Sequence, residues 1–429
     1  MSNNKIKPSI LPGFMELLPK EQLIFNDIVS KITGVYEENG FLPMDTPIIE
    51  KEEVLLAKSA GETEKQVYRL TKGDKNLALR FDLTVPFARF AAQYMNDLTF
   101  PFKRYQLGKV YRGERNQKGR YREFYQCDVD IVGNGKLSIK NDALVVAMAS
   151  RALKKIGLTT YKLQISNRKI LSGFLTALGV TNMQEVMILI DKYEKITREE
   201  FLSELEKLVG KENSEAINNI MGIQGSNDEI ISQLKALKVN SEVFNKGVEE
   251  IEEVKTYLNI FGVEDSEFTI DLKIIRGLDY YTGTVFETIL QGNESYGSVC
   301  SGGRYDNLAQ NYTDNVLPGV GMSIGITRLF FVLKEIGFID KYEHNSSVEY
   351  LIIPIGDTIH YCAKVSKMLQ ERGSKAEIYL EDDKLKKKMS YANKLNIKKV
   401  VIIGEDEVKS GEIVVKDMTT GEQEKVSMK

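Results

Sequence analysis

The chain of 429 residues contains no tryptophan, only two histidines and only three cysteines. No apolar run approaches the roughly 18 residues that a membrane helix requires, so we expect no membrane partner. Cys127, Cys300 and Cys362 stand far apart, which excludes a disulfide framework and a zinc site of the Cys-x-x-Cys type. The first twelve residues lack the apolar core of a secretion signal, so we expect a cytoplasmic protein with reduced cysteines.

The two histidines, His344 and His360, both lie in the last fifth of the chain. A catalytic triad or a multi-histidine metal site would have to be built from that end alone, so we expect no metal site made from histidine or cysteine. We therefore expect arginines and carboxylates to be the functional residues of any active site. The net charge of −3 gives no global signal for nucleic acid, and such a partner must be met by local basic patches.

Periodicity predicts a mixed fold for the first three-quarters of the chain. A helical apolar stripe covers 20–39, an extended segment with two prolines follows at 41–50, and helical periodicity returns at 138–156. The β-type runs are 77–81, 105–112, 122–132, 267–275, 283–290 and 296–301, and the second and third of these flank a glycine- and charge-rich loop as in an antiparallel hairpin. We therefore expect an α+β domain with a mixed, mainly antiparallel sheet flanked by helices.

Two other regions differ from this domain in composition and in the periodicity of their apolar residues. Residues 170–261 are rich in lysine and glutamate with apolar positions at helical spacing, which predicts an inserted helical subdomain that divides the first domain into 1–169 and 262–338. Residues 346–429 alternate strand and helix patterns, which predicts a separate, mostly parallel α/β domain. The expected strands there are 349–355, 375–380, 398–403 and 411–417, and the expected helices are 358–372 and 384–395.

Residues 103–122 form a strongly basic segment, with eight lysines and arginines against one acid, Glu114. This local excess of positive charge in a chain of net charge −3 is suited to a polyanion. Arg112 and Glu114 are separated by one residue, so both project from the same face of the expected strand. A guanidinium suits phosphate and a carboxylate suits an exocyclic amine, a combination that favours a nucleotide. A solvated basic hairpin is the alternative.

Three further segments combine turns or glycines with residues that can bind small substrates, and each alone is weak evidence. Arg276 precedes a glycine and two adjacent tyrosines, whose hydroxyls can contact a small substrate, although packed aromatics at a turn are the commoner meaning. The glycine-rich stretch 301–328 ends at Arg328, which can approach a phosphate. Asp82 and Thr84 share one side of a strand end and can hold an ammonium group.

The order of these segments resembles that in the histidyl-tRNA synthetases, a family of class II aminoacyl-tRNA synthetases, over nearly the whole chain. Residues 40–50, with Pro47, resemble motif 1, which builds the dimer interface in the family. The segment YRGERNQKGRYREF resembles motif 2, and the segment GVGMSIGITRLF resembles motif 3. Two histidine-specific signatures are matched by RGLDYYTG at 276–283 and SGGRYD at 301–306. The tail, with GDTIHYCAKVSKMLQERG and VVIIGEDE, resembles the anticodon-binding domain.

This resemblance implies a role for each candidate residue. Arg112 would bind the ATP α-phosphate and the histidine carboxylate, and Arg276 would be catalytic by neutralising charge on the α-phosphate while it contacts histidine. For ATP, the resemblance implies that Glu114 and Phe124 bind adenine and that Arg328 binds the γ-phosphate. For histidine, it implies that the α-amino group is bound by Asp82, Thr84 and Gln126. The imidazole would be bound by Asp130 and Tyr281, in a pocket shaped by Tyr280 and Tyr305.

The implied reaction is activation of L-histidine with ATP and Mg²⁺ to histidyl-adenylate, followed by transfer to the 3′ end of tRNA(His). It needs no protein nucleophile, and the Mg²⁺ arrives with ATP. The family resemblance also implies a homodimer. Expected tRNA contacts are Arg115, Lys118 and Arg120 at the acceptor end, and Lys386, Lys387 and Lys388 in the tail. A solvated amphipathic helix is the alternative for the tail lysines.

Two other functions compete with this interpretation. The first is a non-catalytic paralogue, the regulatory subunit of ATP phosphoribosyltransferase in histidine biosynthesis, which resembles the synthetase core. That protein usually lacks the anticodon domain and its motif arginines drift, whereas Arg112, Arg276, Arg328 and the tail are all present here. The second is an RNA-binding or signalling module built on the same fold, which would not need both an imidazole site and a triphosphate site.

Overall fold

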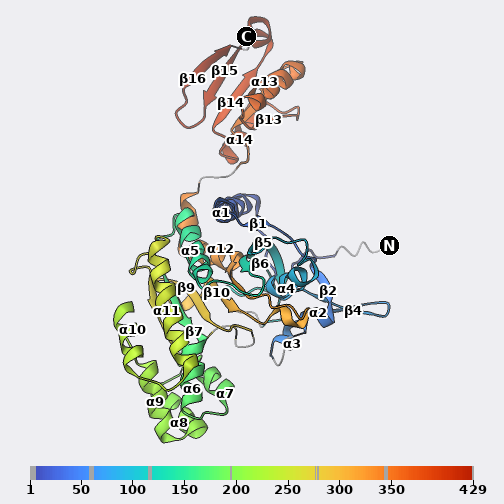
Figure 1. Ribbon diagram of the computed structural model, residues 1–429. Helices are drawn as coiled ribbons and strands as arrows, with labels where there is room; N and C mark the ends of the chain where they lie inside the picture. The colour runs from blue at the N-terminus through green and yellow to red at the C-terminus, as the bar shows by residue number, and fades with distance from the viewer. Residues whose placement is uncertain are drawn as a thin grey trace. The chain divides into compact units, whose positions relative to one another are not determined.

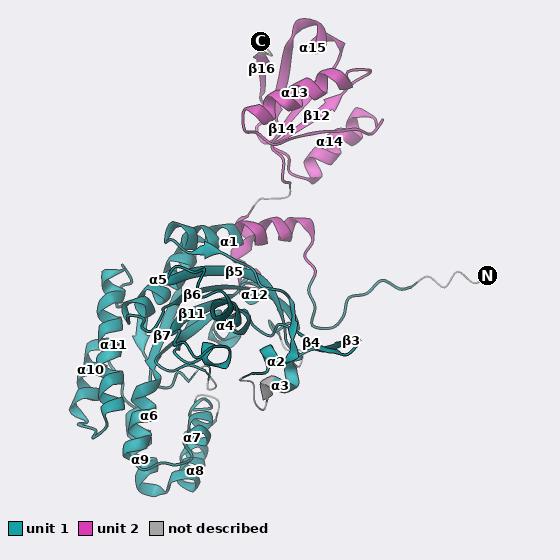
Figure 2. Ribbon diagram, turned by 45° about the vertical axis from the view of Figure 1, so that its right-hand side comes forward, with its two compact units in different colours: residues 1–15, 29–332 teal, residues 16–28, 333–429 magenta. Residues whose placement is uncertain are grey.

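The computed structural model describes residues 6–57, 62–114, 118–193, 196–275, 277, 280–342 and 346–427. The chain divides into two compact units (Figure 2). The first comprises residues 1–15 and 29–332, and the second comprises residues 16–28 and 333–429.

An eight-stranded sheet forms the centre of the first unit (Figure 1). The strand order is β1-β5-β6-β11-β10-β9-β7-β8, with parallel pairs at the two ends and antiparallel pairs between them. This arrangement confirms the expected mixed, mainly antiparallel sheet. The strands are β1 (Leu42–Pro43), β5 (Phe102–Tyr111), β6 (Glu123–Val132), β7 (Tyr161–Asn167), β8 (Phe268–Ile270), β9 (Thr284–Leu290), β10 (Cys300–Tyr305) and β11 (Gly319–Gly325).

The two faces of this sheet have different coverings. Helix α5 packs against β6, β9, β10 and β11, and its Val145, Ala149 and Leu153 are fully buried. The opposite face carries the polar residues described below. The bounds of α5 are Lys140–Lys155, and the first unit also contains α4 (Thr84–Gln93) and the short turns η1 (Glu294–Tyr296) and η2 (Ala309–Asn311). The division between the two units falls within α1 (Pro19–Glu38) and α12 (Ile326–Glu335), and the turn η3 (Phe338–Lys341) belongs to the second unit.

A small antiparallel sheet of three strands, in the order β2-β4-β3, follows the motif 1 segment. Buried Leu55, Val67 and Ala78 form its core. Its elements are β2 (Ile49–Lys51), α2 (Glu52–Leu55), α3 (Glu62–Gln66), β3 (Arg69–Lys72) and β4 (Lys75–Leu79).

The helical insertion lies between β7 and β8, which pair in parallel. Its helices begin where the sequence provides side-chain caps: the hydroxyl of Thr197 accepts the Glu200 amide, and Ser226 and Glu229 form a reciprocal capping box. These helices confirm the expected helical character. They are α6 (Arg168–Ala177), α7 (Met183–Ile190), α8 (Arg198–Val209), α9 (Lys211–Met221), α10 (Asn227–Ala236) and α11 (Glu242–Ile260).

Two expected strands differ strongly from their predicted bounds. The strand predicted over 267–275 ends at Ile270, because the Asp271 carboxylate accepts the backbone amide of Lys273 and turns the chain. The strand predicted over 296–301 begins at Cys300 and continues through the whole SGGRY segment. Gly302 permits this pairing, because a Cβ there would lie 2.2 Å from the Gly321 carbonyl oxygen.

The second unit contains a five-stranded sheet in the order β13-β12-β14-β15-β16. Its first three strands are parallel and the last two are antiparallel, so the expected α/β module is confirmed with a mixed sheet. Helix α15 and strand β16 were not predicted. The elements are β12 (Tyr350–Pro354), α13 (Ile359–Glu371), β13 (Ala376–Ile378), α14 (Leu385–Lys394), β14 (Lys399–Ile403), α15 (Glu405–Ser410), β15 (Glu412–Asp417) and β16 (Gln423–Ser427).

Within the described parts of the chain, no helix is both long enough and apolar enough to span a bilayer.

Candidate active site

Strand β6 presents Gln126, Asp128 and Asp130 on one face of the eight-stranded sheet, because alternate residues of a strand point the same way. Pairing with β5 places Arg104 opposite Asp130. On the other side of β6, Ser323 of β11 lies opposite Asp128. The face of the sheet turned away from α5 is therefore polar, and all of these residues except Ser323 are at most 8% exposed.

Asp130 is held by two partners. Its Oδ2 lies 2.6 Å from Nη2 of Arg104, and its Oδ1 accepts the Tyr305 hydroxyl at 2.6 Å. Burial raises the pKa of Asp130, while the Arg104 guanidinium and the Tyr305 hydrogen bond oppose that rise. Gly321 makes room for this carboxylate, because a Cβ there would lie 1.8 Å from Asp130 Oδ1. Asp130 Oδ1 therefore accepts a hydrogen bond, whereas its buried Oδ2 has the ion pair with Arg104 and no hydrogen-bond partner among the described residues.

Asp82 lies just before the first turn of α4, next to Thr84. Its Oδ1 accepts the backbone amide of Val85 at 2.9 Å. Burial raises the pKa of Asp82. Hydrogen bonds from the backbone amides of Val85 and Thr84 and the charge of the nearby Arg112 guanidinium partly offset this rise. Arg112 itself donates from Nε to the Phe81 carbonyl at 3.1 Å, and its guanidinium lies 4.4 Å from the Phe81 ring centre. Asp82 and Arg112, both singled out from the sequence, thus lie near each other.

Gln126 is fixed at its amide nitrogen, which donates to the Ser323 hydroxyl at 2.6 Å. Its Oε1 is buried and has no hydrogen-bond partner among the described residues. A buried acceptor without a partner is costly unless a ligand or water completes it. The free Oε1 is therefore available to a donor of the substrate.

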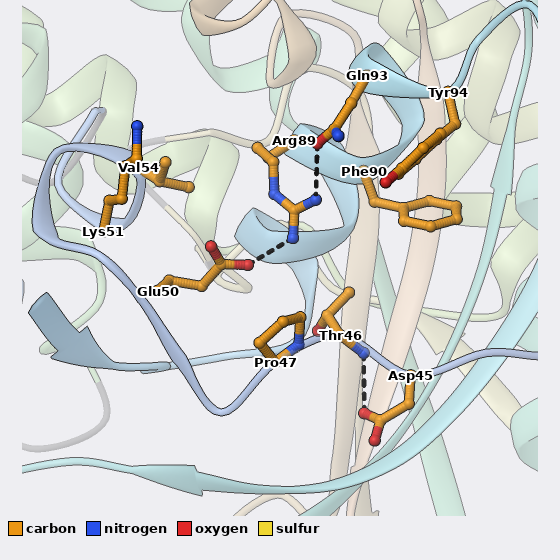
Figure 3. Close-up of a pocket in the computed structure, with 10 residues that line it drawn as sticks. All are labelled: Asp45, Thr46, Pro47, Glu50, Lys51, Val54, Arg89, Phe90, Gln93 and Tyr94. Carbon is orange, nitrogen blue, oxygen red and sulfur yellow. Dashed lines mark hydrogen bonds and ion pairs between the residues drawn. The ribbon is translucent and has the colours of Figure 1, made fainter.

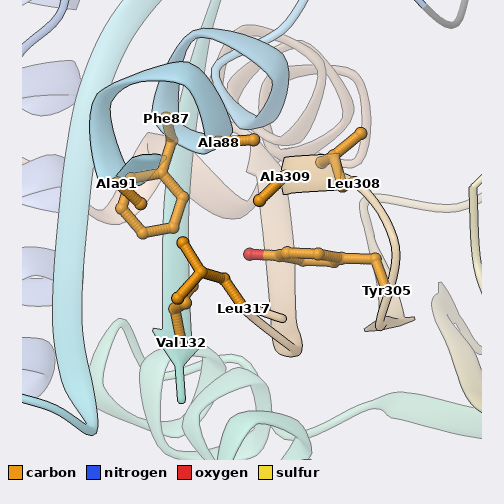
Figure 4. Packing of buried hydrophobic residues seen from close by; sticks show 8 residues of the cluster. All are labelled: Phe87, Ala88, Ala91, Val132, Tyr305, Leu308, Ala309 and Leu317. Carbon is orange, nitrogen blue, oxygen red and sulfur yellow. The ribbon is translucent and has the colours of Figure 1, made fainter. Parts of the chain in front are cut away.

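The ring centres of Tyr280 and Tyr281 lie 4.5 Å apart with the ring planes tilted by 55°, and both rings pack against a core cluster that includes Tyr305. In Figure 4 the Tyr305 ring lies among Ala309, Leu317 and Leu308. Burial raises the pKa of both Tyr280 and Tyr281, so their hydroxyls remain protonated donors. Gly277 adopts φ +55°, and a Cβ there would lie 2.3 Å from the Tyr281 ring, which explains a glycine at this position.

Hydrogen bonds join the segments 276–283 and 301–306. The Thr282 hydroxyl donates to Asp306 at 2.6 Å, and the Thr282 amide donates to the Arg304 carbonyl at 2.8 Å. Arg304 also forms an ion pair with buried Asp142 of α5 at 2.7 Å. Arg304 and Asp306 therefore hold the loop that carries the tyrosines, a role that the sequence did not indicate.

Motifs 2 and 3 meet at the start of α12, where the Tyr125 amide donates to the Thr327 hydroxyl at 2.8 Å. The adjacent Phe124 ring lies 5.2 Å from the Arg112 guanidinium. Arg328 donates to the Ser298 carbonyl at 3.0 Å. These contacts bring the predicted adenine and phosphate residues onto neighbouring elements.

The described part of the motif 2 loop folds back against α12 and its surroundings. Glu114 forms an ion pair with Arg120 at 3.2 Å, and both side chains are partly exposed. The Lys118 ammonium lies 5.7 Å from the Tyr296 ring centre. Arg115 and Arg276, both singled out from the sequence, lie outside the described residues.

The three tail lysines differ in their surroundings. Lys386 is exposed, and Lys387 is 71% exposed while it pairs with Asp383 at 2.9 Å. Lys388 is only 6% exposed, and its ammonium donates to the Pro354 carbonyl at 3.0 Å. Lys388 thus anchors α14 to the end of β12, whereas Lys386 and Lys387 are exposed.

A cavity of about 520 Å³ opens beside the motif 1 segment (Figure 3). Glu50 and Arg89 form an ion pair within it, and Arg89 also donates to Gln93 at 3.2 Å. Pro47 and Tyr94 line its walls. None of the residues predicted to bind histidine or ATP lines this cavity.

Sequence reasoning missed several residues of the polar face, namely Arg104, Gln106, Asp128 and Ser323. The signal for Asp128 was present, because the alternation in QCDVD puts it on the same face as Gln126 and Asp130. Arg104 was counted only as part of a basic hairpin, yet it is fully buried and donates to Gln106 at 3.3 Å. In the described residues, no group of three histidine, cysteine or carboxylate side chains is arranged to hold a metal ion.

The fold and this site define a class II aminoacyl-tRNA synthetase: a mainly antiparallel sheet carries a buried polar face, with an arginine and a stacked aromatic on the hairpin and an arginine at the start of the following helix. A family model described as "Histidyl-tRNA synthetase" matches residues 13–329, and a model described as "Anticodon binding domain" matches residues 349–429. The chain therefore belongs to the histidyl-tRNA synthetase family.

Individual relatives agree with this assignment. A protein of Clostridium acetobutylicum named "Histidine--tRNA ligase" is 73% identical, with 99% of each chain covered. The structure of the histidyl-tRNA synthetase from Nostoc sp. PCC 7120 superposes with a TM-score of 0.90 at 38% identity, covering 99% of this chain and 97% of that one. A Bacillus halodurans structure described as "an ATP phosphoribosyltransferase regulatory subunit/histidyl-tRNA synthetase" gives a TM-score of 0.76 at 22% identity, over 90% of this chain and 97% of that one, which is a likeness of fold alone.

Proposed function

We propose that the chain activates L-histidine with ATP to form histidyl-adenylate and pyrophosphate, and then transfers the histidyl group to the 3′ end of tRNA(His). The observation that carries this proposal is the convergence of Asp82, Arg112, Gln126, Asp130 and the tyrosines at one buried polar face. This set offers an anion-binding guanidinium beside acceptors for an ammonium and partners for an imidazole. Its membership of the histidyl-tRNA synthetase family supports the same reaction.

In the first step the histidine carboxylate attacks the α-phosphorus of ATP, and pyrophosphate leaves. Arg112 would hold the histidine carboxylate and the α-phosphate together, which is a positioning and electrostatic role. Arg276 would neutralise the developing charge on the same phosphate, a role assigned from the sequence resemblance. The Mg²⁺ would enter with the triphosphate as part of the substrate.

ATP would lie along the hairpin. Phe124 would stack on the adenine ring, and Glu114 would accept its exocyclic amine. The present ion pair of Glu114 with Arg120 is half-exposed, so exchanging it for adenine costs little. Arg328, at the start of α12, would bind the γ-phosphate.

In the second step the terminal adenosine of the tRNA attacks the carbonyl carbon of the adenylate, and AMP leaves. Lys118 and Arg120 of the motif 2 loop are exposed and would contact the acceptor end, together with Arg115. Lys386 and Lys387 of α14 would contact phosphates of the tRNA backbone. Binding would then weaken as the salt concentration rises.

We also infer a homodimer and a cytoplasmic location. Leu42, Ile48, Ile49 and Tyr94, around the motif 1 segment and its cavity, are 40–60% exposed, which leaves apolar surface for a second copy to cover. Sedimentation of an Ile49→Glu variant tests this, because it should become a monomer while the parent remains a dimer. The three buried free cysteines fit a reducing compartment.

The test of function is ATP–pyrophosphate exchange with each of the twenty amino acids. Exchange that depends on histidine alone is the expected result, followed by charging of tRNA(His). Absence of exchange, with histidine still bound in calorimetry, would instead support the regulatory paralogue of ATP phosphoribosyltransferase. Exchange with another amino acid would refute the assignment of the pocket.

A further inference from the structure

Asp45 belongs to the motif 1 segment and is exposed, yet its carboxylate accepts hydrogen bonds from two buried side chains. It follows β1, whose parallel pairing with β5 brings it beside the middle of β5, and it lines the cavity of Figure 3. Its side chain is 74% exposed. Its Oδ1 accepts the side-chain amide of Gln106 at 2.7 Å and Nη1 of Arg80 at 3.1 Å, and both donors come from residues that are at most 2% exposed. The surface of the motif 1 segment is therefore joined to the interior of the large sheet at Asp45.

Gln106 has both ends of its side-chain amide in use. Its Nε2 donates to Asp45 and, at 3.2 Å, to the Thr46 hydroxyl, and its Oε1 accepts Nη1 of Arg104 at 3.3 Å. Arg104 and Gln106 project from the same face of β5, because alternate residues of a strand point the same way. The acceptor at Asp45 fixes the direction of the amide, since the reverse direction would set its N–H donors against the guanidinium and its oxygen against the carboxylate. Gln106 therefore depends on the motif 1 segment to present its oxygen to Arg104.

Arg104 in turn contacts two parts of the proposed histidine pocket. Its Nη2 lies 2.6 Å from Oδ2 of Asp130 and donates to the Leu83 carbonyl at 3.2 Å. Leu83 stands between Asp82 and Thr84, the two residues proposed to hold the α-ammonium, and Asp130 is proposed to bind the imidazole. A guanidinium that lost its partner at Gln106 would therefore shift against both ends of the substrate.

We propose that Asp45 and Gln106 are positioning residues for histidine, which act by holding Arg104 against Asp130 and against the Leu83 carbonyl. This inference rests on the proposed function. Neither residue would touch the substrate, and none of the hydrogen bonds named above involves the residues proposed to bind only ATP, namely Glu114, Phe124 and Arg328. Loss of the series should therefore weaken the binding of histidine and leave that of ATP unaltered.

The experiment measures the KM for histidine and the KM for ATP in pyrophosphate exchange. Asp45→Ala should raise the KM for histidine about 3- to 10-fold, the value of one hydrogen bond, and should leave the KM for ATP unchanged. Asp45→Asn keeps an acceptor oxygen for Gln106, so it should restore the KM for histidine to within about twofold of the parental value. The control is Asp97→Ala, which removes an exposed carboxylate just after α4 and should have both parental KM values.

A double-variant cycle tests the link through Gln106. Gln106→Met removes both ends of the amide at similar volume and should itself raise the KM for histidine. Asp45→Ala should then add nothing in the Gln106→Met background, because the two side chains act in series. If Gln106→Met does not fold, the comparison of Asp45→Ala with Asp45→Asn tests the inference by itself.

Four results would overturn the inference. An unchanged KM for histidine in Asp45→Ala would remove the series from histidine binding, and a parallel rise in the KM for ATP would show a general loosening of the unit. An effect of Asp45→Asn as large as that of Asp45→Ala would assign it to the charge that pairs with Arg80, and additive effects in the cycle would exclude Gln106 as the link. Failure of the proposed function is a separate outcome, because the parent would then show no histidine-dependent exchange at all.

Discussion

The two large sheets of this molecule use their buried faces differently. The eight-stranded sheet of the first unit buries charged and amide side chains on one face, among them Arg104, Gln126 and Asp130. The five-stranded sheet of the second unit has apolar clusters that contain Ile352 and Val401 on one side, and Leu351 and Val400 on the other. The first sheet therefore buries polar side chains on one face, where we propose that the substrate binds, whereas the second sheet has an apolar core on each face.

The unpaired polar atoms follow the same division. Of the buried side-chain nitrogen and oxygen atoms without a partner in the described residues, only the Tyr361 hydroxyl belongs to the second unit. Oxygens of Gln126 and Asp128 are among those of the first unit. Such atoms lower stability until a ligand pairs with them, so the first unit gives up stability for binding.

The largest effect is expected from breaking the buried pair of the first sheet. In Arg104→Met, Asp130 keeps only Tyr305 as a partner and its buried charge is uncompensated, which should cost about 3–5 kcal/mol of unfolding free energy. The loss should be smaller at low pH. Without Arg104 the pKa of Asp130 rises further above its unfolded value, so the cost appears only as pH increases and the carboxyl must ionise. Urea unfolding at pH 5 and pH 8 measures both quantities. An equal loss at the two pH values would contradict the role of Asp130 as the uncompensated group.

The second-largest effect is expected on the rate of pyrophosphate exchange. Arg112→Ala should slow histidine-dependent pyrophosphate exchange about 10²–10³-fold, because it removes a charge that stabilises the reacting phosphate. Its melting temperature should change little, since the guanidinium makes one backbone hydrogen bond. Arg372→Ala, which removes an exposed arginine of the second unit, is the control and should exchange normally. The resemblance predicts the same loss for Arg276→Ala, and near-normal exchange in that variant would refute its catalytic role.

The sequence predicted the fold where periodicity is strong. The β5–β6 hairpin, the helical insertion and the alternation of the second unit were all expected from apolar spacing, and all are present. The errors occurred where side chains end or prolong an element. The Asp271 turn shortens β8, and Gly302 lets β10 continue to Tyr305, beyond the predicted end at residue 301. The close approach at Gly302 involves a strand that is distant in sequence, whereas the Asp271 turn is a local feature.

The site was predicted less completely, for a related reason. The family resemblance pointed to Asp82, Arg112 and Asp130, but it could not show that Asp130 forms an ion pair with Arg104 across the hairpin. Nor could it distinguish Lys388, which is buried, from Lys387, which is exposed. Both distinctions depend on burial, and burial follows from the packing of the whole unit.

A conservative change in the second sheet should have a smaller effect. Ile352→Val removes one methylene from a fully buried position in β12 and should cost about 0.5–1.5 kcal/mol. Pyrophosphate exchange should be unchanged at 25 °C, because adenylate formation uses residues of the first unit alone. Chemical denaturation followed in parallel with exchange tests this. A fall in exchange at a temperature where the variant is folded would show that the two units are coupled in the first step.

The smallest effect concerns the surface of the second unit. Lys386→Ala combined with Lys387→Ala should weaken tRNA binding modestly and reduce the slope of log affinity against log salt by about one for each phosphate contact that is lost. Exchange without tRNA should stay at the parental rate. Lys388→Met is the matched comparison: its ammonium is bonded to the Pro354 carbonyl, so the change should lower the stability of the unit and leave the salt slope of the folded protein unaltered. An unchanged slope in the double variant would mean that this face of α14 is solvated, and that tRNA is bound by another surface.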